Sequence, residues 1–304
     1  MKKFSLTILL IAFGFVAFSQ EEENEEPKQG WTRTGNIALL FNQSYFNDEW
    51  TGGGTSNIAG NLSLNYDANY RKDKLTWDNR FTAEYGATQL KDDDFERKTN
   101  DRLELNSILG YQIGESLWSY SFFANFKTQF AKGYEYNTDV APVTRLETTR
   151  FMSPGYLQFG PGMLWKKNDN FKINIAPATS RLIFVSDKFT DVGNDQAVID
   201  TFNDAGGYFG VEANETMRFE FGASVSAYAK INLMENVSME NILNLYSNYL
   251  EDPQNVDIDY TMNIVMQINK YLSANLIFQA IYDDNAVQAF QIREVFGLGI
   301  NFGI

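Results

Sequence analysis

The 304-residue chain is acidic, with a formal net charge of −14, and it contains neither histidine nor cysteine. The excess of acid argues against a nucleic-acid partner, because phosphates require a basic face. The missing imidazole excludes hydrolases that depend on a Ser-His or Asp-His pair, and the missing thiol excludes disulfides and lipid-carrying cysteines. With 44% hydrophobic and 15% aromatic residues, the composition is not that of a disordered chain.

The first twenty residues are typical of a secretory signal peptide. Two lysines precede an apolar run from Phe4 to Phe18, which is too short to span a bilayer comfortably. We therefore expect residues 1–20 to direct export and to be removed, and an uncleaved membrane anchor is the alternative. An acidic, flexible leader is expected at 21–30, followed by a single ordered domain at 31–304.

The stretch from Ser56 to Tyr70 alternates between two kinds of residue. Every second position from Ile58 is apolar, aromatic or small, and polar residues occupy nearly all positions between them. Since successive side chains of an extended chain point to opposite faces, this period of two predicts a strand with one apolar and one polar face. The predicted strand is longer than the roughly five or six residues that are usual in soluble sheets.

Eleven other stretches keep the same alternation, so the sequence predicts about twelve strands. Their approximate ranges are 34–46, 56–70, 75–90, 101–113, 117–131, 154–166, 171–185, 217–233, 237–250, 256–269, 271–283 and 290–302. Tight turns follow the even-numbered strands, and mostly longer loops follow the odd-numbered ones. This pattern predicts an all-β, antiparallel transmembrane β-barrel in the bacterial outer membrane, with both termini in the periplasm. Closure is expected because hydrocarbon cannot satisfy the backbone groups of a free sheet edge.

Aromatic residues cluster near both ends of the predicted strands. Trp77 and Trp118 lie beside tight turns, and Tyr45 and Phe130 lie near longer loops. Two belts of amphipathic rings are typical of the two interfaces of a membrane. The last strand ends near Phe302 and resembles the C-terminal signal that is read by the barrel-insertion machinery of Gram-negative outer membranes.

Charged residues on the polar faces are expected to line the outer half of the lumen. They are Glu84, Arg102, Glu104, Lys127, Arg181, Arg218, Glu220, Asp257, Asp259 and Arg293. Their signs interleave in strand order, so they are suited to pairing across a narrow lumen, and buried charges are satisfied only when they find partners. We therefore favour a largely blocked lumen with this charge network as its candidate binding site, and an open pore is the alternative.

Four apolar residues also point into the predicted lumen on adjacent strands: Ile242, Val265, Ile277 and Ile281. Because apolar side chains tend to find dry neighbours, we expect them to pack beneath a loop that folds into the barrel. A groove for a lipid or another hydrophobic ligand is the alternative.

Other kinds of site have little support in the sequence. A zinc site is not expected without histidine or cysteine. The acidic loops at 92–94 and 191–195 offer oxygen ligands for calcium, but neither has the spacing of a complete calcium loop, so solvated loops are favoured. We expect no metal, no cofactor and no enzymatic activity.

The first long loop contains Trp50, Gly52, Gly53, Gly54 and Ser56. This pattern resembles the W-x-x-G-G-x-x-S/N motif of an uncharacterised family of Bacteroidota outer-membrane proteins that carry a domain of unknown function. The resemblance implies a barrel in the outer membrane and supplies no mechanism. The glycines would let the loop fold back so that the tryptophan packs into the barrel mouth or anchors its rim.

The sequence thus predicts a non-enzymatic outer-membrane barrel that acts as a structural or accessory component of the envelope. Its expected partners are outer-membrane lipid and other envelope proteins that dock on its long loops. A narrow channel for small polar or hydrophobic solutes is the alternative function.

Overall fold

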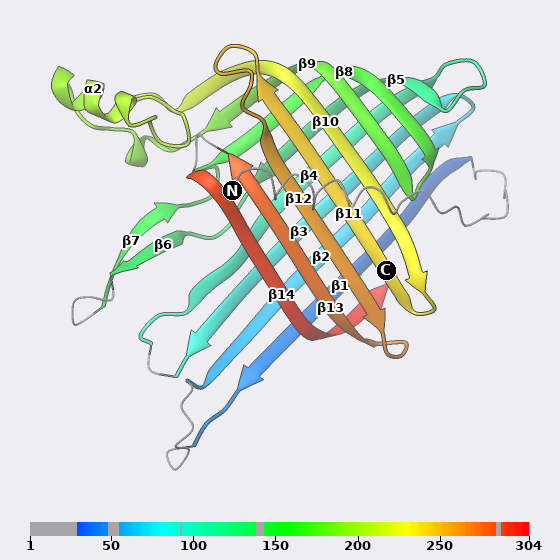
Figure 1. Ribbon diagram of the computed structural model, residues 1–304, viewed down its shortest axis with the longest axis horizontal. Coiled ribbons are helices and arrows are strands. Elements are labelled where there is room, and N and C mark those ends of the chain that lie inside the picture. Colours follow the sequence, from blue (N-terminus) through cyan, green and yellow to red (C-terminus); the bar gives the residue numbers. More distant parts are fainter. Residues whose placement is uncertain (1–28, 48–54, 92, 138–142, 284–286, 304) are drawn as a thin grey trace.

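Twelve long strands form one closed antiparallel barrel in the computed structural model of the chain (Figure 1). The structure describes all residues except 1–28, 48–54, 92, 138–142, 284–286 and 304. The barrel strands are β1 (Gly30–Ser44), β2 (Asn57–Lys72), β3 (Leu75–Leu90), β4 (Arg97–Gln112), β5 (Trp118–Thr128), β8 (Gly155–Asn168), β9 (Phe171–Phe184), β10 (Met217–Met234), β11 (Val237–Asn248), β12 (Asp257–Gln267), β13 (Leu272–Asp283) and β14 (Val287–Gly303). Around the ring they follow the order β1-β14-β13-β12-β11-β10-β9-β8-β5-β4-β3-β2.

The predicted fold class and the twelve predicted strands are confirmed, and the differences lie at strand ends. β1 begins at Gly30, which pairs with Arg71 of β2, so this residue belongs to the barrel and not to the predicted leader. β4 begins at Arg97 instead of near residue 101, because Arg97 pairs with Thr88 of β3 beyond an irregularity in the register.

The connections give the barrel two different ends. Short turns join the strands at one end, such as residues 73–74 between β2 and β3, and longer loops join them at the other, such as residues 185–216 between β9 and β10. Both ends of the described chain lie with the short turns, since Gly30 pairs with Arg71 and Gly303 pairs with Asn36. Which side of a membrane this end faces stays a prediction.

Apolar side chains cover the outside of the barrel, as the period of two predicts. Leu39 and Phe41 of β1 are 47% and 50% exposed, whereas Leu40 between them turns inward and is 4% exposed. The neighbouring β2 repeats the pattern with Ile58 and Leu62 on its outer face. A soluble sheet would bury this face in a core, so the outer surface of the barrel is suited to lipid.

Aromatic rings form groups at both ends of the outer surface. At the short-turn end, the ring of Trp31 lies 5.3 Å from that of Tyr70 and 5.6 Å from that of Trp77. At the long-loop end, the rings of Tyr282 and Phe290 lie 5.3 Å apart. The described residues therefore include both predicted aromatic belts.

Two of the long loops carry structure of their own where the sequence analysis expected only connections. The loop after β5 contains a hairpin of β6 (Gly133–Asn137) and β7 (Thr144–Thr149), and the loop after β9 contains the 3₁₀ helix η2 (Asp187–Phe189) and α2 (Gln196–Asp204). Figure 1 shows both projecting from the long-loop end of the barrel. No helix among the described residues is long and apolar enough to cross a membrane.

The hairpin and the helical loop are joined by polar and aromatic contacts. Glu147 of β7 forms ion pairs with Arg150 at 2.6 Å, with Lys188 at 2.8 Å and with Lys132 at 3.3 Å. Hydrogen bonds from these three side chains lower the pKa of the Glu147 carboxyl from its ordinary 4.5 to about 2. The hydroxyl of Tyr208 also donates to the carbonyl of Thr148. The two loops therefore form one unit, which we call the loop platform (residues 132–149 and 186–216, as far as they are described).

Candidate functional site: the charged lumen

The inward faces of the strands carry the predicted charge network. All ten predicted residues take part in ion pairs with one another or with charged neighbours. These pairs are Arg102–Glu104, Lys127–Asp259, Arg181–Glu220, Arg181–Asp257, Arg218–Glu220 and Arg293–Glu84. The structure thus brings the predicted residues together, while their role in binding stays a prediction.

Lys127 and Asp259 connect opposite walls of the barrel. The Nζ atom of Lys127 on β5 donates to Oδ2 of Asp259 on β12 at 2.6 Å. Four strands separate β5 from β12 on one side of the ring and six on the other. The second carboxylate oxygen of Asp259 accepts from Gln279 at 3.0 Å, so the carboxylate is held from two directions.

Glu104 lies beside this bridge in the centre of a polar cluster. It is 2% exposed, and it accepts hydrogen bonds from Arg102 at 2.6 Å, from Asn106 at 2.8 Å and from Asn125 at 2.7 Å. Burying a carboxylate is tolerable only when hydrogen bonds and an opposite charge replace its water. Arg102 and Asn106 on β4 and Asn125 on the adjacent β5 point inward like Glu104, so the same wall of the barrel supplies these partners.

Arg181 of β9 organises a second cluster nearer the long loops. Its side chain is 7% exposed and forms ion pairs with Glu220 at 3.6 Å, with Asp283 at 3.5 Å and, more closely, with Asp257. The guanidinium also lies 4.9 Å from the ring centroid of Tyr246. The cluster therefore ties β9 and β10 to β12 and β13 across the lumen. Asp283, at the very end of β13, was not among the predicted residues.

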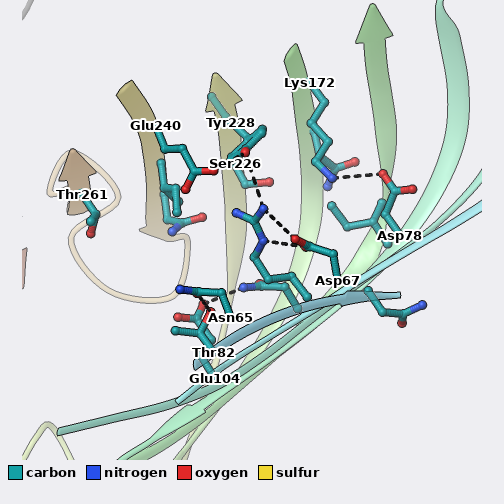
Figure 2. A pocket seen from close by; sticks show the side chains of 18 of the residues that line it. Asn65, Asp67, Asp78, Thr82, Glu104, Lys172, Ser226, Tyr228, Glu240 and Thr261 are labelled. Carbon is teal, nitrogen blue, oxygen red and sulfur yellow. Dashed lines mark hydrogen bonds and ion pairs between the residues drawn. The ribbon is translucent and has the colours of Figure 1, made fainter. Parts of the chain in front are cut away.

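A third group of charges lies toward the short turns and was missing from the predicted set. Arg80 of β3 donates to Asp67 at 2.7 Å and to the hydroxyl of Tyr228 on β10 at 3.5 Å, and that hydroxyl donates to Glu240 at 2.9 Å. Figure 2 shows Asp67 and Tyr228 in the lumen, and its dashed lines mark the contacts that Arg80 makes with each of them. β3 and β10, like β5 and β12, are separated by four strands on one side and six on the other.

Asp78 belongs to the same group and holds two lysines. Lys166 of β8 and Lys172 of β9 approach its carboxylate at 2.7 Å and 3.0 Å. These residues have the inward parity of the predicted set, so the alternation that located the outer half of the network would also have located this half.

Cavities remain between the ion pairs. A cavity of about 560 Å³ lies around Arg181 and Asp257, and one of about 130 Å³ lies around Arg80 and Tyr228 (Figure 2). Glu104 lines both. The lumen is therefore divided by bridging side chains but is not filled solid.

Three of the four predicted apolar lumen residues line these spaces. Ile242 and Ile277 line the smaller cavity, and Ile281 lines the larger one. Each of the three faces open space. This placement does not test the predicted packing beneath a loop, and it does not test the alternative of a ligand groove.

In the described parts of the acidic loops, Asp93 and Asp195 have partners within the protein. Asp93 forms an ion pair with Arg97 at 2.5 Å, and Asp195 caps the N-terminus of α2 by accepting from the backbone N–H of Ala197. Across the described parts of the chain, no three acidic side chains gather closely enough to hold a metal.

Most of the predicted loop motif falls on residues 48–54, which include Trp50, Gly52, Gly53 and Gly54 and lie outside the described residues. Ser56 is described, and its hydroxyl accepts from the backbone N–H of Phe46 at 2.8 Å. The serine therefore joins the two ends of the first long loop.

The comparison with protein families gives a match over part of the chain. Residues 41–134 match the model of a family described as "Protein of unknown function (DUF3078)". This match supports the predicted resemblance to a family of unknown function, whereas the Bacteroidota origin and the loop motif stay predictions. A search of curated proteins found no match.

Solved structures with a similar arrangement include three outer-membrane barrels. An outer membrane channel from Pseudomonas putida F1 has a TM-score of 0.39 at 10% identity, with 94% of this chain and 99% of that one covered. The translocator domain of an autotransporter from Neisseria meningitidis has a TM-score of 0.40 at 7% identity, covering 98% and 94%. The outer membrane phospholipase A from Escherichia coli has a TM-score of 0.34 at 12% identity, covering 92% and 94%. Because these identities and TM-scores are low, the activities of the three proteins are not assigned to this chain.

Proposed function

We propose that the protein is an outer-membrane β-barrel that serves as a non-enzymatic structural or accessory component of the envelope, with a lumen closed to the flow of solutes. The observation that carries this proposal is the pairing of side chains across the lumen. Lys127–Asp259 and Arg80–Tyr228 each join strands on opposite walls. A solute would have to separate these partners in order to pass.

The proposed place in a membrane is supported by the outer surface. The barrel exposes a belt of apolar side chains between two groups of aromatic rings. Polar groups on this face have partners near the aromatic rims: Asn79 donates to the carbonyl of Ala68 at 3.0 Å, and Asn241 accepts from Tyr260 at 2.8 Å. Satisfied polar groups on a lipid-facing surface avoid the cost of leaving them unpaired in hydrocarbon.

Docking of other envelope proteins on the loop platform is part of the proposal. The platform is held by Glu147 and its three cations and by the stacked rings of Phe189 and Tyr208, whose centroids lie 5.0 Å apart. A rigid surface loses less conformational entropy on binding than a flexible loop does. Crosslinking in intact cells should therefore capture protein neighbours through the platform, and deletion of residues 134–148 should abolish that capture while the barrel still folds.

A narrow channel is the second candidate, favoured by the two cavities that share Glu104 as a lining residue. Conductance across planar bilayers separates the two functions. The sealed barrel should be silent, and the variant K127A/D259A, which lacks one bridge, should show brief openings. The variant D93N/R97Q removes an ion pair at the loop end and serves as the matched control, which should stay silent. Steady conductance of the unmodified protein would establish the channel instead.

A further inference from the structure

The seam between the first and last strands is incompletely paired. β1 and β14 pair from Asn36↔Gly303 to Phe41↔Leu298, and the register ends there. Beyond that point, Asn42 to Ser44 of β1 pair only with β2, and Val295 to Gly297 of β14 pair only with β13, among the described residues. Figure 1 shows the two strands diverging toward the long-loop end.

A cleft of about 520 Å³ occupies this divergence, and we call it the seam cleft. Its lining includes Leu40, Asn42, Asn61, Thr99, Arg293 and Gly297. These residues come from the two strands of the seam and from β2 and β4, and they include both inward and outward faces, so the cleft penetrates the barrel wall. A neighbouring cavity of about 500 Å³ at the lumen mouth shares Thr99 and Arg293 with it.

Arg293 brings an incompletely satisfied positive charge to the seam cleft. Its Nε and Nη1 atoms are buried without a hydrogen-bond partner, and its Nη2 atom is 4.0 Å from the carboxylate of Glu84. That carboxylate also accepts from Asn100 at 2.9 Å. Unpaired buried donors cost free energy, so a guanidinium with two unpaired nitrogen atoms is prepared to bind an acceptor, and an anionic acceptor gives the strongest hydrogen bonds.

The outer rim of the seam cleft is mainly apolar, and Glu294 is the one carboxylate among the described residues that line the cleft. Phe41, Ile292 and Phe296 line the cleft and are 50%, 67% and 57% exposed on the outer face of the barrel. The positive charge of Arg293 thus lies inside the wall, and a mainly apolar surface that includes Glu294 lies outside it. A molecule bound in the seam cleft would therefore contact both the charge of Arg293 and the apolar side chains of the outer rim.

We propose that the seam cleft binds a single-chain amphiphile with an anionic head group. The head group accepts hydrogen bonds from Nε and Nη1 of Arg293, and the chain leaves the wall between β1 and β14 along Phe41 and Phe296. The seam cleft is thereby a lateral binding site that faces the surrounding lipid. The site rests on the proposed location in a membrane, but it does not depend on the lumen being sealed.

Photolabelling tests the site directly. The folded protein in vesicles of a neutral phospholipid is irradiated with palmitate that carries a diazirine on its chain, and labelled peptides are identified by mass spectrometry. Labels are expected on the segments around Phe41 and around residues 290–297. Unlabelled palmitate should compete, whereas hexadecanol, which lacks the charge, and acetate, which lacks the chain, should not.

Variants separate the contribution of charge from that of space. R293Q should weaken competition by palmitate on the order of tenfold or more, as expected for the loss of a charge-assisted hydrogen bond. G297F should block the cleft, whereas G297A should bind normally, because a Cβ atom at this position meets its nearest neighbour only at 3.6 Å. K230Q removes a lumen cation outside the cleft lining and is the charge control. Each variant is used only if it retains the heat-modifiable mobility of a folded barrel.

Three labelling results would overturn the proposal. They are labels elsewhere on the barrel, equal competition by hexadecanol, and labelling that is unchanged in R293Q and G297F. A second copy of the chain in the seam would appear as a stable dimer in detergent with no effect of R293Q, and it would also overturn the proposal. If the protein proved not to be a membrane barrel, it would remain soluble without detergent, so that failure is distinguishable from failure of the site.

Discussion

The bridge between Lys127 and Asp259 should contribute measurably to the stability of the barrel. The two side chains are 31% and 16% exposed and lie 2.6 Å apart. Breaking a fully buried ion pair costs about 3–5 kcal/mol, and an exposed pair is worth about 0–1 kcal/mol. Because both side chains are partly exposed, we expect a value between these limits. Each single variant, K127M or D259N, should lose about 2 kcal/mol in the free energy of unfolding.

The coupling between the two residues is measured by a double-mutant cycle. Urea unfolding in vesicles, followed by tryptophan fluorescence, gives the free energies for the unmodified protein, both single variants and K127M/D259N. Removing both partners leaves no unpaired charge, so we expect the double variant to lose about 1–2 kcal/mol less than the sum of the singles.

A pair on adjacent strands of the same wall provides the control. Lys230 and Glu240 lie 3.4 Å apart and are 42% and 25% exposed, so their coupling should stay below about 0.5 kcal/mol. Additive losses for Lys127 and Asp259, within about 0.3–0.5 kcal/mol, would refute the bridge as a source of stability.

Three further predictions concern packing, backbone approach and pH. L164A should destabilise the barrel by about 2–4 kcal/mol in the same urea assay, because this inward side chain is 1% exposed, whereas L62A on the outer face should cost less. G222A should lower the yield of heat-modifiable barrel, since its Cβ would lie 1.9 Å from the carbonyl oxygen of Ser247, while G60A, with no neighbour closer than 4.0 Å, should fold normally. The lowered pKa of Glu147 means that its contribution to platform stability is complete above pH 4.5 and is lost as the pH falls through about 2. Proteolysis of residues 133–149 should accelerate over that window, and E147Q should be cleaved at a rate that changes little with pH.

The barrel strands were predictable because apolar side chains outside the barrel and polar ones inside it impose a period of two along the whole strand. The same parity placed Lys127, Asp259 and Arg181 in the lumen and, extended further, would have placed Arg80 there. Which charges become partners depends on the stagger between distant strands, and no local pattern encodes that stagger.

The loop platform and the seam cleft were missed for different reasons. α2 has an N-cap at Asp195 and apolar residues at Val198 and Phe202, a local signal that could have been recognised. The seam cleft follows from the point at which the β1–β14 register stops. That point depends on closure of the complete ring, so it becomes visible only in three dimensions.

The bridges across the lumen also have a consequence for assembly. Arg80 and Tyr228 are 148 positions apart in the chain, and Lys127 and Asp259 are 132 apart. Contacts of such separation carry a large loop-closure cost until intervening strands have paired. Their charges therefore remain hydrated while the sheet is growing, and water leaves the lumen only when the opposite walls meet. We therefore expect the Lys127–Asp259 and Arg80–Tyr228 contacts to form late in the folding of the barrel.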